Sequence, residues 1–130
     1  MLFRKISGII GKTTISLTAV IILTTGFVYG LSEEEKVSLY NKGEEFFLEG
    51  EYKKALEFYE KILSEDQTYA DAIGAKGAVF HRLGDYDKAL EFYDLAITHE
   101  PKNPHFLNDR GNAFLILGRD IEAEKIWNNH

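Results

Sequence analysis

The stretch KALEFY at Lys54–Tyr59 recurs unchanged at Lys88–Tyr93, 34 residues further along the chain. An offset of 34 residues is the period of helix-turn-helix repeat arrays, in which each unit is a pair of antiparallel helices. The duplication therefore predicts an all-α chain of stacked helical pairs. Such arrays present extended surfaces to other chains, so the pattern favours binding over catalysis.

The same spacing relates glycines, alanines and aromatic residues across three units, at residues 36–69, 70–103 and 104–130, the last of them incomplete. A glycine inside a helix lowers stability by about 1 kcal/mol relative to alanine, so its recurrence predicts close packing at that point. Glycines between the helices are expected to adopt the left-handed conformation that ends a helix. The recurring sets are Gly43, Gly77 and Gly111 within helices, Gly50, Gly84 and Gly118 between helices, Ala55, Ala89 and Ala123, and Phe46, Phe80 and Phe114.

Helix boundaries can be predicted from capping residues. Ser32 followed by Glu35 is a capping box, and Asn103-Pro104 places a cap before a proline at the first helical position. We expect helices near residues 33–48, 52–65, 70–82, 86–99, 104–116 and 120–129.

On these residues the chain resembles the tetratricopeptide repeat (TPR) family from residue 36 to about residue 130. The resemblance implies three antiparallel helix pairs stacked as a right-handed superhelix. Two departures stand out: Gln67 replaces the proline that closes the second unit at Pro101, and no helix follows the third unit. Because each repeat buries only what its neighbour covers, Ile126 and Trp127, together with Ile121, could leave an apolar patch.

Residues 1–30 predict a signal peptide or an amino-terminal transmembrane anchor, and residues 31–130 the repeat domain. Met1–Lys12 is basic, and Thr13–Ser32 is uncharged and just long enough to cross a bilayer as a hydrophobic helix. Val28 and Gly30 suit the positions three and one before a signal-peptidase cut at Leu31. Of the two alternatives, the signal peptide is favoured. In both cases the charge asymmetry predicts export of the domain, either secreted or tethered to the outer face of the cytoplasmic membrane.

Charge and composition limit the classes of partner and site that the domain can have. From Leu31 onward the chain has 12 Lys+Arg against 21 Asp+Glu, so the domain should repel nucleic acid. No cysteine is present, which excludes disulfides and thiolate metal sites. We expect a protein or peptide partner, with membrane contact through residues 13–32.

In the family, the first helices of successive units line a concave groove that holds a peptide. By register, the resemblance implies a groove formed by Tyr40, Glu44, Asp71, Gly74, Ala78, His81, Arg82, His105, Asn108 and Asn112, with Val37, Phe47, Leu48, Leu115 and Ile116 beside them. The asparagine amides could bond a peptide backbone. Family members that grip chaperone carboxylates use lysine, arginine and asparagine at positions held here by Tyr40, Glu44, Ala75, His105 and Asp109. A carboxylate at Glu44 would repel such a ligand, so we do not expect that specificity.

No catalytic residues, cofactor or metal site are predicted. The four histidines lack metal-ligand spacing, although His81 and His105 share the expected groove, and no phosphate loop or nucleophile motif is present. We expect a non-enzymatic interaction scaffold or adaptor. The alternatives are a structural protein that self-associates through its uncapped third unit, and the targeting arm of a longer chain or enzyme complex.

Overall fold

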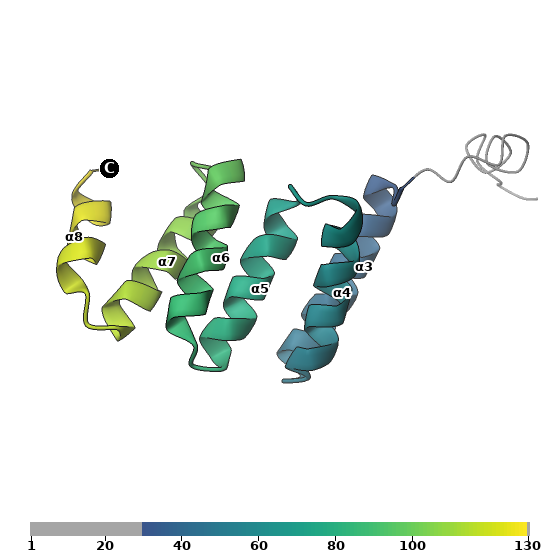
Figure 1. Cartoon of the computed structure of the whole chain (residues 1–130), viewed down its shortest axis with the longest axis horizontal. Helices are drawn as coiled ribbons and strands as arrows, with labels where there is room; N and C mark the ends of the chain where they lie inside the picture. The colour runs from purple at the N-terminus through teal and green to yellow at the C-terminus, as the bar shows by residue number, and fades with distance from the viewer. Residues whose placement is uncertain (1–29, 130) are drawn as a thin grey trace, which may run out of the picture. The chain divides into compact units, whose positions relative to one another are not determined.

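A computed structural model describes residues 30–129, without the side chains of residues 120–123. Within this range the chain is all-α and contains no strand. The helices follow one another as three antiparallel pairs (Figure 1). Their bounds are α3 (Glu33–Leu48), α4 (Tyr52–Glu65), α5 (Ala70–Arg82), α6 (Tyr86–His99), α7 (Pro104–Ile116) and α8 (Asp120–Asn128). The predicted boundaries are confirmed, except that the last helix ends one residue earlier.

The capping residues predicted from the sequence form the helix ends in the structure. Ser32 Oγ accepts from the Glu35 amide at 3.2 Å, and Glu35 Oε2 accepts from the Ser32 amide at 2.8 Å, which completes the capping box. Asn103 Oδ1 accepts from the His105 amide, with Pro104 at the start of α7. Gly50 has a φ of +80°, a conformation that side chains disfavour, and the two glycines at the same register behave alike.

The core consists of three apolar clusters along the stack, all within Leu31–His130. Among the described residues, Tyr59 and Tyr93 are the largest fully buried side chains, at 0% and 1% exposure. Each ring lies beside a glycine of the preceding helix, Gly43 or Gly77, where a methyl group would collide with it. The predicted close approach is therefore confirmed. Because this part of the chain has its own core, we expect residues 31–130 to fold as a separate unit.

Phenylalanine stacking also joins the helices of a pair. The Phe46 and Phe58 rings stack with centroids 5.5 Å apart, and Phe80 and Phe92 repeat the arrangement at 5.4 Å. These four rings are half-buried, so they pack at the edge of the core beside the buried tyrosines.

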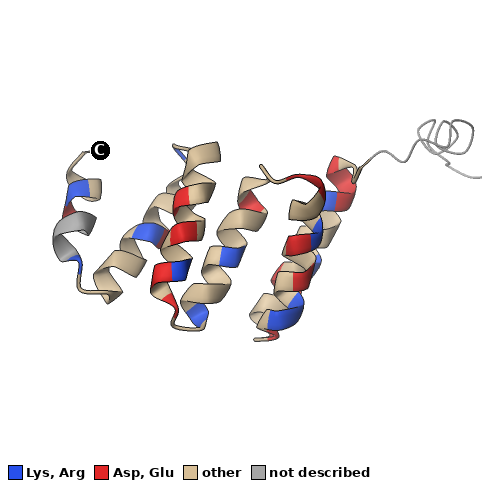
Figure 2. Cartoon of the chain, viewed as in Figure 1, with Lys and Arg blue, Asp and Glu red and all other residues tan. Residues whose placement is uncertain are grey.

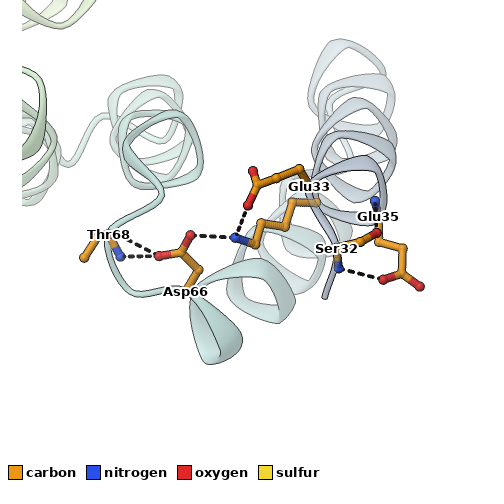
Figure 3. Close-up of polar contacts among 6 residues, drawn as sticks. Ser32, Glu33, Glu35, Asp66 and Thr68 are labelled. Atoms are coloured by element: carbon orange, nitrogen blue, oxygen red, sulfur yellow. Dashed lines mark hydrogen bonds and ion pairs between the residues drawn. The ribbon is translucent and has the colours of Figure 1, made fainter. Parts of the chain in front are cut away.

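An ion-pair network holds the turn that lacks the closing proline. Lys36 Nζ donates to Asp66 Oδ2 at 2.8 Å and to Glu33 Oε1 at 2.7 Å (Figure 3). Asp66 Oδ1 also accepts from the amide and the hydroxyl of Thr68, at 3.0 and 2.7 Å. The Lys36 side chain is only 10% exposed. The network therefore fixes the turn after α4 to the start of α3, two elements 30 residues apart in sequence.

Asp66→Asn is expected to make the domain less sensitive to acid. The hydrogen bonds from Lys36 and Thr68 lower the pKa of Asp66 from 3.8 to about 2. Because the folded pKa is below the unfolded one, the stabilisation is present above about pH 4 and is lost as pH falls toward 2. The free energy of unfolding, measured with urea at several pH values in this range, should fall more steeply with decreasing pH for the wild type than for the variant. An equal dependence on pH in both proteins would mean that the ionised Asp66 contributes nothing to stability.

The predicted amino-terminal segment, residues 1–30, lies outside the described residues apart from Gly30. Among the helices that the structure describes, none is both long enough and apolar enough to span a bilayer.

Candidate functional site

The first helices of the three pairs, α3, α5 and α7, pack in succession and line a common face with two adjoining hollows. One hollow of about 210 Å³ spans all three helices, and a second of about 530 Å³ lies beside it toward α6. Phe47, Ala78 and Asp109 border both hollows. We refer to the two hollows together as the groove.

The structure brings most of the predicted groove residues together. The smaller hollow includes Tyr40, Glu44, Asp71, Gly74, Ala78 and His105, and the larger one includes Ala78, His81 and Arg82. Two predicted residues lie elsewhere. Asn108 borders a separate hollow beside Trp127, and Asn112 is an exposed residue of α7 that borders neither this hollow nor the groove. Contact of any of these residues with a partner remains a prediction.

Some groove residues were not in the predicted set. Phe106 and Asn103 border the smaller hollow, and Tyr86 and Tyr93 of α6 reach the larger one. Asp109 borders both, one helical turn after His105. The resemblance placed Asp109 at a ligand-contacting position of carboxylate-binding repeats, although the predicted groove set did not include it.

Glu44 is held in place by the core. The buried Tyr59 hydroxyl donates to Glu44 Oε1 at 2.6 Å, and burial together with this hydrogen bond raises the Tyr59 pKa. The Tyr40 ring lies beside Tyr59 with centroids 5.9 Å apart. Burial also raises the Tyr40 pKa, with smaller contributions from the charges of Glu44 and Asp71. The first-unit wall of the groove is therefore aromatic, with one fixed carboxylate.

Two further carboxylates face the groove without a hydrogen-bond donor among the described residues, those of Asp71 and Asp109. Burial raises the pKa of Asp109, although the charges of His81 and His105 act in the opposite direction. Partial burial raises the pKa of Asp71 as well, and Glu100 adds to this effect while His105 opposes it. The groove therefore contains desolvated acidic groups that are incompletely compensated.

The cationic and ring groups of the larger hollow are partly engaged with one another. Arg82 lies over the Phe47 ring, 5.8 Å from its centroid, and His81 meets Tyr86 edge-on at 5.1 Å. Arg82 is the only permanently charged cation that borders the groove within the described part of the chain. A ligand would meet an acidic, aromatic surface over most of its length.

Asp109→Asn is expected to raise the free energy of unfolding at neutral pH. A carboxylate whose folded pKa is raised above its unfolded value destabilises the fold when ionised, and acidification relieves the effect. Removing the charge removes that penalty. Thermal unfolding of the wild type and the variant at pH 7 and near pH 4 tests this, because the gain should shrink on acidification. A lower melting temperature for the variant at pH 7 would show that Asp109 stabilises the fold.

The repeat period, the interhelical glycines and the shared face of the first helices agree with a family comparison. The family model for the tetratricopeptide repeat matches residues 46–112, more than half of the chain. The chain belongs to the tetratricopeptide repeat family. This confirms the family and the all-α fold of helix-turn-helix repeats that the resemblance implied.

Solved structures of similar fold include the three described here. The second TPR of Spaghetti (RPAP3), bound to the HSP90 peptide SRMEEVD, is 25% identical with a TM-score of 0.66, and the alignment covers 72% of this TPR chain and 86% of that one. MamA is 27% identical with a TM-score of 0.66, over 72% of this chain and 54% of MamA, so this chain spans about half of that protein. The CopN-Scc3 complex, at 17% identity and a TM-score of 0.66, shows the fold alone. No curated protein matches the chain.

Proposed function

We propose that this TPR protein is a non-enzymatic interaction scaffold that binds a segment of a partner protein in the groove. The groove carries the proposal, because it crosses all three first helices and offers aromatic surface together with incompletely paired carboxylates. Three units aligned in this way suit an extended or helical peptide better than a small molecule. A similar repeat structure, the second TPR of Spaghetti, is bound to a peptide.

The charges of the groove favour a basic segment. Glu44, Asp71 and Asp109 border it, whereas Arg82 lies at one end over Phe47. A lysine or arginine side chain of the ligand would neutralise Asp71 or Asp109 and could pack on the Tyr40 or Phe47 ring. An acidic segment would be repelled, so we expect SRMEEVD, the peptide bound by the Spaghetti repeat, to bind this groove poorly.

Peptide selection tests both the location and the charge preference. A random peptide library displayed on phage would be selected against immobilised residues 31–130, and the selected sequences should be enriched in lysine and arginine. The double variant Asp71→Asn, Asp109→Asn should bind the selected peptides at least roughly tenfold more weakly, since two charge-assisted contacts are lost.

A matched control changes the same amount of charge outside the groove. Glu57 and Glu91 are exposed and occupy equivalent positions on α4 and α6, two helices that carry charged residues of both signs (Figure 2). The variant Glu57→Gln, Glu91→Gln should keep the affinity of the wild type. Equal weakening in both double variants would indicate a nonspecific effect of net charge, and selection of acidic peptides would contradict the proposal.

Export of the repeat domain is a further part of the proposed function and is supported by the charge asymmetry around residues 13–32. Intact mass measurement of the protein recovered from its native host tests it. A chain that begins at Leu31 would indicate a cleaved signal peptide, and a full-length chain in the membrane fraction would indicate an anchor. A full-length chain in the soluble cytoplasmic fraction would contradict export.

A further inference from the structure

The end of the stack beyond α7 and α8 has an apolar hollow of about 570 Å³, separate from the groove. Its apolar lining residues are Pro104, Leu107, Ile126 and Trp127, and its polar ones are Lys102 and Asn108. The Trp127 side chain is 64% exposed, in contrast to the buried rings Tyr59 and Tyr93 at the same register. We call this hollow the end socket.

The repeat register shows what covers such a surface elsewhere in the molecule. Tyr59 is buried in one cluster with Ala72, Ala75 and Val79 of α5, the first helix of the next pair. Tyr93 is likewise in one cluster with Ala113 of α7, which occupies the register position of Val79. We call the contact between one helix pair and the first helix of the next pair a joint. In both joints that first helix covers the tyrosine ring with small side chains. The end socket is the third surface of this kind. Because an α-helix covers the first two, the shape of the end socket suits an α-helix as well.

Tyr40, Gly74 and Asn108 occupy equivalent positions in the three units. The size of the residue there limits the size of the side chain that the covering helix can place against it. In the first joint this position is Tyr40, and the facing cluster contains the small Ala72. In the second joint it is Gly74, where an added Cβ would lie 2.8 Å from Phe106 Cδ1, so the large ring occupies the space that glycine leaves. Asn108 fills that space in the end socket. The covering helix therefore needs a small side chain there, as α5 has in Ala72.

Charge is less important for the end socket than for the internal joints. Lys76 pairs with Glu60 at 3.4 Å in the first joint, and Arg110 pairs with Asp94 at 2.9 Å in the second. The next acceptor position in this register is Asn128, which is uncharged. A helix bound here gains no ion pair at that point, so apolar packing must supply most of the affinity.

A second copy of the chain does not supply a suitable helix in head-to-tail stacking. The outward side of α3 is mostly polar. A shallow hollow there is bordered by one apolar residue, Val37, and otherwise by Glu34, Ser38, Asn41, Lys42 and Glu45. Asn41 and Glu45 hold the register positions of Ala75 and Val79, so stacking would place a carboxylate against Trp127. That contact would bury an unpaired charge, which is unfavourable.

We propose that the end socket binds an amphipathic α-helix of a different protein, with small apolar residues at the spacing of Ala72, Ala75 and Val79. The helix lies over Trp127 as α5 lies over Tyr59, and its small residue faces Asn108. This second surface is independent of the groove, so the protein could join two partners at once.

A fluorescence titration tests the end socket directly, because Trp127 is the only tryptophan in the chain. The probe is a peptide copying Gln67–Arg82, held helical by a hydrocarbon staple through the positions of Gly74 and Ala78. Titrated into residues 31–130, it should shift the Trp127 emission to shorter wavelength and saturate. The same peptide with Ala72→Phe should bind roughly tenfold more weakly, because its ring meets Asn108.

The variant Asn108→Gly makes the test specific to the packing. With that protein the Phe peptide should gain affinity relative to the Ala peptide, as Gly74 admits Phe106, and the four titrations form a double-mutant cycle. Glu57→Gln, far from the socket, should leave both affinities unchanged. An emission that neither peptide moves, or the same preference in both proteins, would overturn the proposal. An emission that depends on the protein concentration alone would also overturn it, by indicating that a second copy covers Trp127.

Discussion

Tyr59→Ala is expected to lower the free energy of unfolding by about 3–5 kcal/mol, the range for truncating a buried aromatic side chain. Tyr59 is fully buried, and it joins the first pair to α5 through a cluster that includes Ala72 and Val79. Its loss would leave a cavity between two units, which the helices can close only by shifting relative to each other. Urea unfolding followed by circular dichroism measures the change.

Tyr59→Phe is the matched control for this substitution. It keeps the ring and removes only the hydroxyl that donates to Glu44 at 2.6 Å, so we expect a loss of about 1–2 kcal/mol. The difference between the two variants isolates the packing of the ring. If both variants lost the same free energy, the hydrogen bond to Glu44 within the first pair, and not the packing of the buried ring, would account for the contribution of Tyr59 to stability.

Gly77→Ala is expected to destabilise the domain by about 1–3 kcal/mol, although alanine is the better helix former. An added Cβ would lie 2.7 Å from Tyr93 Cε1 and 3.3 Å from the Ala89 carbonyl oxygen. The tyrosine is buried and the carbonyl belongs to the backbone of α6, so neither can move away without separating the two helices. Thermal and urea unfolding measure the loss.

Gly111→Ala makes the comparison sharp, because it is the same change at the same register. Among the residues whose side chains the structure describes, the nearest atom is Trp127 Nε1 at 3.3 Å, and the exposed indole is free to adjust. We expect this variant to be neutral or more stable by up to about 1 kcal/mol, from helix propensity alone. Destabilisation of equal size in both variants would mean that backbone conformation and not close packing explains the recurring glycines.

The fold could be predicted almost completely from the sequence because its signals are local and repeated. The 34-residue period recurs along the chain, whereas the Ser32–Glu35 capping box and the Asn103-Pro104 start depend on neighbouring residues. All three are present in the structure. The Lys36–Asp66 ion pair could not be predicted. Lys36 has the appearance of an ordinary surface residue, and its partner lies 30 residues away.

The candidate site was predicted only in part, for reasons of geometry. Register identifies residues on the first helices, so it found Tyr40, Asp71 and His105 but not Tyr86, which reaches the groove from α6. Asn108 follows Tyr40 and Gly74 in register, yet these positions face the next unit along the stack. In the third unit that direction leads to the end socket and not to the groove. Repeat register therefore predicts where a backbone position lies better than what its side chain faces.

The central claim is that the groove binds a basic peptide, and an NMR titration tests it most directly. A lysine-rich peptide from the library selection would be added to ¹⁵N-labelled residues 31–130. We expect the largest amide shifts on the groove side of α3, α5 and α7, around Tyr40, Asp71 and Asp109, and their loss in the Asp71→Asn, Asp109→Asn variant. Shifts confined to α4 and α6, or unchanged in that variant, would contradict the claim.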